Sequence, residues 1–364
     1  MQRVMKMQAA LILANGRVFR GTSMGAAEEK VFEAVFNTSM AGYQEVLTDP
    51  SYAGEGVVMT YPLIGNYGVN GEDGESGRAW PEAFIVRHLA ARGSNFRCEG
   101  TLDDYLKQYG ITGICDVDTR AITRVLRDEG TMNAMITTDP DVDVDAALEK
   151  IRAYRVRGTV ERVTREKPQV YAGTGGPRVA LLDYGVKENI IRGLVSRGCE
   201  VTVFPAHTKA DEILAGGFDG VMLSNGPGDP ADCGDLIAEV KKLYDSTLPI
   251  FAVCLGHQFM AIATGARTEK LKYGHHGGNH PVRDFAAGRV YITSQNHNYC
   301  VVADSVDPAV ATVSHVNVND GSVEGLRYQN GRVETVQFHP EAAPGPQDTA
   351  YLFDRFVARM GGKA

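Results

Sequence analysis

One cysteine stands at a point of the sequence where it could act as a nucleophile. The stretch PIFAVCLGHQF, residues 249 to 259, places Cys254 between an apolar run and a segment with helical character. The start of a helix favours the thiolate, which is the form of cysteine that attacks. A sharp strand-to-helix turn would also aim the next backbone N–H, that of Leu255, at a developing oxyanion. Gly256 would let such a turn pack closely, because it has no side chain.

The partners that such a cysteine needs are found near the end of the chain. A nucleophile requires a base, and the base requires a group that holds its tautomer and stabilises its protonated form. VETVQFHPEAAPG ends an apolar strand in His339 and Glu341, and residues two apart in an extended segment point to the same side. If both strands belong to one parallel sheet, His339 and Cys254 lie at the same edge of it.

Each of these features also has a simpler explanation as local structure. Free cysteine is among the residues most often buried, so a lone cysteine at a strand end is most simply a core residue. A lone His-Pro-Glu segment is more often a turn than half of a catalytic group. The combination of the two, at the ends of strands in one sheet, favours catalysis.

Two further segments suit contacts with a polar substrate. LSNGPGDP contains Gly226 and Gly228, which either form a tight turn or let backbone N–H groups approach a ligand. TSQNHNYCV predicts a turn that carries Asn296, Asn298 and Tyr299, and the amide of Asn296 could hydrogen-bond a substrate or the turn itself. Local pattern alone leaves both alternatives open.

A third segment, KYGHHGGNHP, offers His275, His276 and His280 as possible metal ligands. Its two glycines and Pro281 favour an irregular loop, and no cysteine or acidic cluster completes a ligand set. We therefore expect no metal. The chain also lacks the G-x-x-x-x-G-K-[ST] pattern of a P-loop, so we expect no ATP bound by that route.

The elements that must position these residues fall into two parts. The first 150 residues mix short strand-like runs with many glycines, and they include one helix over TRAITRVLRDE, capped by Asp118 or Thr119 and ended by Gly130. Residues 151–177 are charged and then Gly/Pro-rich without period, which predicts a linker.

From Arg178 onward, apolar strands and amphipathic helices alternate. RVALLDYG, VKENIIRGLVSRGC and EVTVFPAH predict a βαβ unit with parallel strands. The expected fold class is α/β. Residues 178–364 should form an open, mostly parallel sheet with helices on both faces, and residues 1–150 a smaller mixed α/β domain.

Composition excludes several classes of function. The 364 residues carry a net charge of -8 with no basic stripe, which argues against a nucleic-acid partner. No segment approaches the roughly 20 apolar residues of a membrane-spanning helix, and the N-terminus does not read as a signal peptide. The six cysteines are widely spaced without a C-x-x-C pair, so we expect a cytoplasmic protein.

Taken together, CLGHQ, SNGPGDP and HPE resemble the class I, Cys-His-Glu glutamine amidotransferases. Further segments narrow the resemblance to the small, glutaminase subunit of carbamoyl phosphate synthetase. They are VFNTSMAGYQEVLTDPSYAG, TYPLIGNYG, SNFR and DVDTRAITRVLR in the N-terminal half, and GHHGGNHPV, QNHNY and HPEAAPGPQD in the C-terminal half. The resemblance covers nearly the whole chain. The C-terminal fold it implies is that of the amidotransferase class, which is flavodoxin-like, and the N-terminal half would contact the synthetase subunit.

The resemblance also implies roles for individual residues. Cys254 is the expected nucleophile, with His339 and Glu341 completing the triad. The remaining site residues would contact glutamine or its oxyanion, and Ser51 would close the site from the N-terminal domain: Ser51, Gly226, Gly228, Leu255, Gln258, Asn296, Asn298 and Tyr299. Asn298 and Tyr299 depart from the family's usual Gly-Phe after QNH. His257 receives no role and is expected at the protein or subunit surface.

The activity implied is hydrolysis of L-glutamine, with ammonia passed to a large subunit that makes carbamoyl phosphate from bicarbonate and ATP. The chain itself needs no cofactor, whereas ATP and Mg²⁺ are expected on that large subunit. The assembly would be a hetero-oligomer, at least a heterodimer, that serves pyrimidine or arginine biosynthesis. Two alternatives remain: a non-catalytic glutamine-sensing or regulatory subunit of the same fold, and an amidotransferase that serves another synthase.

Overall fold

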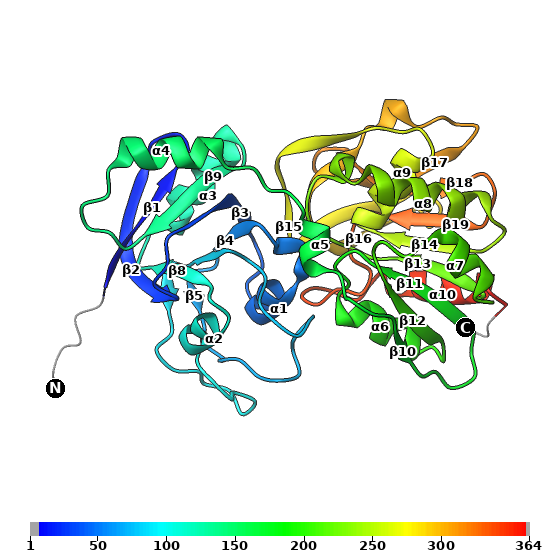
Figure 1. The fold of residues 1–364 in the computed structure, drawn as a ribbon, viewed down its shortest axis with the longest axis horizontal. Coiled ribbons are helices and arrows are strands. Elements are labelled where there is room, and N and C mark those ends of the chain that lie inside the picture. The colour runs from blue at the N-terminus through cyan, green and yellow to red at the C-terminus, as the bar shows by residue number, and fades with distance from the viewer. Residues whose placement is uncertain (1–6, 362–364) are drawn as a thin grey trace. The chain divides into compact units, whose positions relative to one another are not determined.

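The structure is a computed structural model that describes residues 7–361. Internal contacts divide the chain into two compact units, Met1–Arg157 and Gly158–Ala364, each of which is described by itself (Figure 1). None of the helices in the described part of the chain has both the length and the apolar character needed to cross a bilayer.

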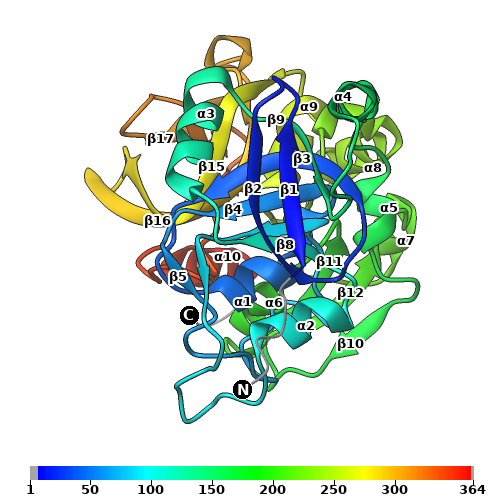
Figure 2. The same cartoon turned by 90° about the vertical axis from the view of Figure 1, so that its left-hand side faces the viewer.

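The first unit is built on a closed barrel, whose strands can be followed in Figures 1 and 2. Its strand order is β1-β2-β8-β6-β4-β3-β9, and β9 pairs back onto β1. The pairs among β3, β4, β6 and β8 are parallel and the others are antiparallel. The strands of this unit are β1 (Gln8–Leu13), β2 (Val18–Gly25), β3 (Lys30–Asn37), β4 (Glu55–Met59), β5 (Leu63–Ile64), β6 (Ala83–Ile85), β7 (His88–Leu89), β8 (Thr112–Cys115) and β9 (Met132–Thr137).

Helices cover the barrel and bury its apolar residues. Ile122, Val125 and Leu126 of α3 pack in one buried cluster with strand residues such as Ile85, whereas α1 and α2 pack in another with Phe84. The predicted helix with its Asp118 cap and Gly130 end is confirmed. The helices are α1 (Tyr43–Thr48), η1 (Pro50–Tyr52), α2 (Leu102–Gln108), α3 (Thr119–Glu129) and α4 (Val144–Ala153).

The second unit contains a sheet that runs, within the described residues, in the order β10-β12-β11-β13-β14-β19-β18-β16-β15-β17. Strands β12, β11, β13, β14 and β19 are parallel, and the remaining pairs are antiparallel. The strands are β10 (Gln169–Tyr171), β11 (Arg178–Asp183), β12 (Glu200–Pro205), β13 (Gly220–Leu223), β14 (Ile250–Val253), β15 (Thr268–Asp284), β16 (Arg289–Val301), β17 (Ala311–Asn317), β18 (Val323–Tyr328) and β19 (Val333–Val336).

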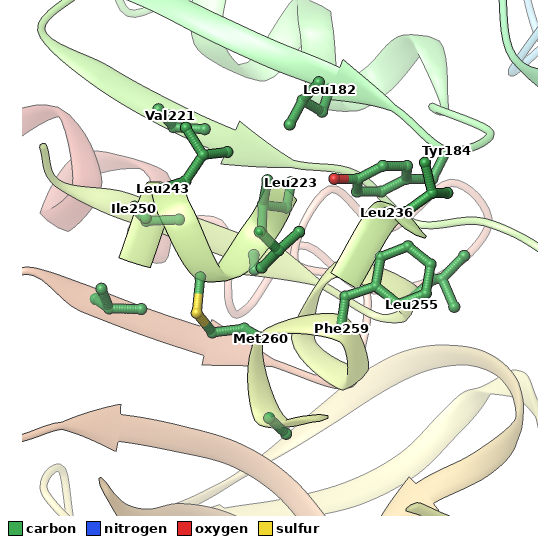
Figure 3. Close-up of a cluster of buried hydrophobic side chains, with 14 of the residues drawn as sticks. Leu182, Tyr184, Val221, Leu223, Leu236, Leu243, Ile250, Leu255, Phe259 and Met260 are labelled. Atoms are coloured by element: carbon green, nitrogen blue, oxygen red, sulfur yellow. The ribbon is translucent and has the colours of Figure 1, made fainter. Parts of the chain in front are cut away.

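Helices lie on both faces of the parallel strands, as predicted. Alternate residues of β11 enter opposite cores: Leu181 joins the cluster with α6 and α10, and Leu182 joins the cluster with α7, α8 and α9. Figure 3 shows the second cluster, which contains Leu223 and Ile250 of the sheet and Phe259 of α9. The helices are α5 (Thr159–Val163), α6 (Glu188–Val195), α7 (Ala210–Ala215), η2 (Pro230–Asp232), α8 (Gly234–Asp245), α9 (Leu255–Ala263), η3 (Ala303–Ser305) and α10 (Tyr351–Arg359).

The structure differs from the sequence-based expectation in three places. The sheet is mixed rather than mostly parallel, because the long hairpin β15–β16 and strands β17 and β18 add an antiparallel half, in which β17 pairs with both β15 and β18. The first unit has the expected mixed α/β content, but its strands close into a barrel, which was not predicted. The expected linker over residues 151–177 contains the end of α4, helix α5 with its buried Val160, and strand β10, which pairs with β12.

Candidate active site

Cys254 occupies a strained turn between β14 and α9. Its backbone angles are φ 53° and ψ -107°, and positive φ is uncommon for a residue with a side chain. Hydrogen bonds hold the turn on both sides: the Cys254 N–H donates to the carbonyl of Val336 (2.9 Å), and the N–H of Gln258 donates to the carbonyl of Cys254 (3.1 Å). Strain that the surrounding structure maintains is typical of functional sites.

The residues after Cys254 explain why the chain can turn here. A Cβ atom on Gly256 would lie 2.7 Å from the Cβ and carbonyl oxygen of Leu223, so the predicted need for glycine at this position is confirmed. The Gly256 N–H donates to the carbonyl of Ser224 at 3.0 Å. Phe259 and Met260 then anchor α9 in the apolar cluster of Figure 3. Close packing therefore fixes the position of the cysteine relative to the sheet.

His339 and Glu341 lie just beyond β19, which is the parallel neighbour of β14. His339 Nδ1 is 2.6 Å from Glu341 Oε1, so the carboxylate orients the ring as the sequence predicts. The backbone N–H of His339 donates to the carbonyl of Ser294 on β16 at 2.9 Å. Lys187 Nζ lies 3.1 Å from Glu341 Oε1 and also donates to the carbonyl of Ala342.

The charges of this group stabilise one another away from water. Burial would raise the pKa of Glu341, but the ammonium of Lys187 and the imidazole of His339 hold it below its usual value. Burial would lower the pKa of His339, but the Glu341 carboxylate and the Cys254 side chain raise it well above its usual value. His339 therefore has the basicity to take a proton from a neighbouring thiol, which leaves an imidazolium beside a thiolate.

The Cys254 thiol lies between His339 and strand β16. Its Sγ atom donates to the carbonyl of Asn296 at 3.6 Å, and it contributes to the raised pKa of His339. Within residues 7–361, His339 Nε2 has no hydrogen-bond partner, although it is buried. The nitrogen opposite the one held by Glu341 is thus available for proton transfer.

Three backbone N–H groups were predicted to bind the oxyanion, those of Leu255, Gly226 and Gly228. No acceptor for any of them is found in the described part of the chain. A Cβ on Gly226 would lie 2.2 Å from the carbonyl oxygen of Tyr184 and 2.8 Å from the Leu255 side chain, so the glycine loop lies against the cysteine turn. Gly228 has φ 95°, which favours glycine there.

The residues predicted to hold glutamine lie along β16 and α9. The Gln258 amide nitrogen donates to the carbonyl of Tyr299 (2.8 Å) and to Gln337 Oε1 (2.9 Å), so it links α9 to β16 and to the residue that follows β19. The side-chain oxygens of Asn296 and Asn298 lie 2.9 Å and 3.0 Å from the two ring nitrogens of His276. These residues lie on a strand, not on the predicted turn.

Ser51 belongs to the first unit. It lies in the 3-10 turn η1, where its backbone N–H donates to the carboxylate of Asp49 at 2.9 Å. Its role in closing the site remains a prediction.

Two buried residues of this region were not anticipated correctly. Lys187 was missed, although it is the N-cap residue of α6, four residues after the end of β11, and the GVKEN segment beyond a buried parallel strand was a usable signal. His257 was expected at the surface but is fully buried, with Nδ1 2.7 Å from Thr335 Oγ1, and burial lowers its pKa to about 3. The prediction for His257 was wrong because its face of α9 packs onto the sheet.

The segment with His275, His276 and His280 is part of β15 rather than an irregular loop. Its pairing with β16 shifts register at two places, before His275 (between Lys270 and His275) and within the segment (between Gly277 and His280). These bulges accommodate the glycines that made the sequence look irregular. His275 does not group with the other two histidines but with His297 and Glu324.

Comparison with known proteins agrees with this geometry. Residues 180–359 match the class I glutamine amidotransferase family, and residues 11–136 match the CPSase domain of the carbamoyl-phosphate synthase small chain. The second unit is thus a class I glutamine amidotransferase domain. The carbamoyl phosphate synthase small chain from Symbiobacterium thermophilum is 49% identical to this chain, over 97% of this chain and 98% of its own length. The one from Clostridium perfringens is also 49% identical, over 96% of this chain and 99% of its own length.

A third relative of that name, from Bacillus caldolyticus, is 48% identical over 97% of this chain and 96% of its own length. The chain belongs to the carbamoyl phosphate synthase small chain family.

Proposed function

We propose that Cys254 is the nucleophile with which this chain, the glutamine-hydrolysing small subunit of a carbamoyl phosphate synthase, opens the side-chain amide of glutamine. The observation that carries the proposal is the strained cysteine turn at the start of α9, next to the buried His339–Glu341 pair. The Sγ atom attacks the carbonyl carbon, a C–S bond forms, and the π electrons of the carbonyl move to its oxygen. The N–H groups of Leu255, Gly226 and Gly228 bind this oxyanion.

His339 moves the protons of both half-reactions. After it takes the thiol proton, its Nε2 gives that proton to the amide nitrogen, the C–N bond breaks and ammonia leaves. The same nitrogen then takes a proton from water, which attacks the γ-glutamyl thioester and releases glutamate and the thiolate. Glu341 holds the ring and stabilises its positive charge, and Lys187 keeps Glu341 ionised.

Glutamine binds between α9 and β16. Gln258 holds this part of β16 in place through the carbonyl of Tyr299, and His276 orients the amides of Asn296 and Asn298. Asn298 takes the place of the family's usual glycine, and its side chain is turned towards His276.

Ammonia is then passed to a large chain, which uses ATP and Mg²⁺ to make carbamoyl phosphate from bicarbonate. The name of the relatives, small chain, supports such a hetero-oligomer. The assembly works in the cytoplasm and supplies pyrimidine or arginine synthesis.

The test is a Cys254→Ser variant reconstituted with its large subunit. Glutamine-dependent synthesis of carbamoyl phosphate should vanish, while ammonia-dependent synthesis should survive, because only the source of ammonia is lost. Cys199→Ser is the matched control, since Cys199 is also buried in the second unit. Glutamine-dependent synthesis that persists in the Cys254→Ser complex would rule out the proposed nucleophile.

The alternative of a non-catalytic glutamine sensor predicts a different chemistry. Incubation with an electrophilic glutamine analogue, followed by mass spectrometry of the intact chain, should show one adduct in the wild type and none in Cys254→Ser. A sensor would remain unmodified in both. An amidotransferase for another synthase would form the adduct but would not restore glutamine-dependent synthesis to the large subunit.

A further inference from the structure

A second group of chemically active side chains lies on the antiparallel half of the sheet. His275 of β15 is paired directly with His297 of β16, and Glu324 lies on β18, the next strand in the sheet order. One donor atom from each side chain lies within 4.8 Å of the donor atoms of the other two. The proposed glutamine hydrolysis uses none of these three side chains.

The group is buried and incompletely paired. Glu324 is 0% exposed, His275 is 5% exposed and His297 is 6% exposed. In the described part of the chain, neither His275 Nδ1 nor Glu324 Oε2 has a hydrogen-bond partner. Buried polar atoms nearly always have partners, yet the nearest acceptor to His275 Nδ1 is Glu324 Oε1 at a long 3.4 Å, and Glu324 Oε2 has none in the described residues, so an oxygen donor is left for a cation.

Neighbouring oxygens select the tautomer of each histidine. His275 Nε2 lies 2.8 Å from Asp320 Oδ2, so a neutral ring donates its proton there and turns the lone pair of Nδ1 towards Glu324. His297 Nδ1 donates to the carbonyl of Tyr299 at 2.8 Å, which leaves a lone pair on Nε2. Metal-binding histidines typically have their second ring nitrogen held in this way by a carboxylate or a backbone carbonyl.

The spacing of the donors suits a four-coordinate ion. Glu324 Oε1 is 3.4 Å from His275 Nδ1 and 3.9 Å from His297 Nε2. Ligands of a tetrahedral zinc ion at its usual bond lengths lie about 3.3 Å apart. Two imidazoles and one carboxylate are also a donor set that zinc and similar divalent transition metals prefer.

We propose that His275, His297 and Glu324 bind one divalent transition-metal ion of the zinc class, with Asp320 orienting His275 from outside the coordination shell. The fourth position is left for water, because the group of mutually close donor atoms found in the described residues contains only these three side chains. The ion would link strands β15, β16 and β18, and it would bind β16 at His297, the residue between Asn296 and Asn298.

A proton and the Gln295 side chain compete with the ion for the ring nitrogens of the two histidines. A proton on His275 is the first competitor: burial lowers the pKa of His275, but the carboxylates of Asp320 and Glu324 outweigh this and raise it to about 9. The Gln295 side-chain oxygen also lies 3.1 Å from His297 Nε2 and must give way or turn its amide.

The test measures metal binding by the full chain without an affinity tag. Protein stripped with chelator is dialysed against limiting Zn²⁺ or Co²⁺ and separated from free ion, and bound metal is measured by mass spectrometry. We expect one ion per chain, and with Co²⁺ the intense visible absorption of a four-coordinate site. Glu324→Gln and His297→Gln should each bind at least about tenfold more weakly, because each removes a ligand.

His315→Asn is the matched control, because His315 is a buried histidine beside a carboxylate, Asp284, on the same half of the sheet. It should load like the wild type. Equal loading of wild type, Glu324→Gln and His297→Gln, or equal loss in His315→Asn, would overturn the proposal, as would no stoichiometric binding by the wild type.

X-ray absorption of the zinc-loaded wild type gives a result that does not depend on the folding of any variant. Ligands at about 2.0–2.1 Å, with imidazole scattering, are expected. A sulfur ligand at about 2.3 Å would place the ion on a cysteine instead and would overturn the assignment.

Discussion

The second unit contains two buried histidine–glutamate groups that differ in what surrounds them. His339 lies beside Glu341 at the end of the parallel strands, and His275 lies beside Glu324 on the antiparallel strands. In both groups the carboxylates raise the pKa of the histidine against the effect of burial. A histidine beside a buried glutamate is therefore not enough to define a catalytic site.

The difference lies in the second partner of each residue. Glu341 also faces the ammonium of Lys187, which lowers its pKa, whereas burial raises the pKa of Glu324. The second nitrogen of His339 is left for the thiol, whereas that of His275 is occupied by Asp320. These differences support the two proposed roles, proton transfer for the first group and cation binding for the second.

The largest expected effect is a difference in the rate of glutamine hydrolysis between variants of His339 and His275. His339→Asn should reduce glutamine hydrolysis by about 10³-fold or more, because the nucleophile loses its base and the leaving group its acid. His275→Asn should keep its rate at saturating glutamine within about threefold. Steady-state ammonia release, measured for both variants beside the wild type, checks this. Equal losses in the two would remove the distinction between the groups.

The next effect concerns the Lys187 ammonium, a positive charge beside the glutamate that the first group has and the second lacks among the described residues. Lys187→Met leaves the buried Glu341 carboxylate without its ammonium and should lower the free energy of unfolding by about 3–5 kcal/mol. Urea unfolding of the variant at pH 7 measures this loss. Adding Glu341→Gln should recover part of it, because the uncompensated charge is then gone. Additive losses in the double variant would show that the two residues are not coupled.

The third prediction uses the pH dependence of the second group. The pKa of His275 is about 9 in the folded chain, against about 6.5 when unfolded. A pKa raised by folding contributes stability that is fully present below about pH 6.5 and is lost as the pH rises towards 9, here roughly 3 kcal/mol. Urea unfolding at pH 6.5 and pH 9, with chelator present, should show this loss.

The variant His275→Asn supplies the comparison for that loss. Its stability should change less than that of the wild type over the same pH interval, because the titrating group is absent. Parallel pH profiles for the two proteins would show that His275 does not carry a proton in the folded state.

The positions of the proposed catalytic residues could be predicted because they depend on local sequence patterns. Cys254, His339 and the Gly226 loop each follow a short apolar strand, and parallel strands bring such ends together. The second group was not predictable in this way. His275 and His297 lie in segments rich in glycine, asparagine and histidine, which have low strand propensity and form strands here through bulges and long-range pairing.

Other features of the fold escaped prediction for a similar reason. The barrel depends on the pairing of β1 with β9, more than a hundred residues apart, which no local pattern records. Strand β10 and helix α5 form in the expected linker because they find partners in β12 and in the core. Tertiary contacts decide such segments, whereas composition alone suggests a loop.

The smallest expected effect is a change in stability that tests whether the backbone at Cys254 is strained. An ordinary buried cysteine would show no such strain. At φ 53°, replacing Cys254 with glycine should relieve the strain that alanine retains, so Cys254→Gly should be more stable than Cys254→Ala by about 1 kcal/mol. Urea unfolding of the two inactive variants measures the difference. Ala261→Gly, within α9, is the control and should lose about 1 kcal/mol, because glycine weakens an ordinary helical position. Replacing alanine with glycine should thus raise the free energy of unfolding at position 254 and lower it at position 261, two helical turns away. Only position 254 has backbone angles that glycine favours. A lower stability of Cys254→Gly than of Cys254→Ala would mean that the turn stores no strain, and that charge alone distinguishes the catalytic group from the one around His275.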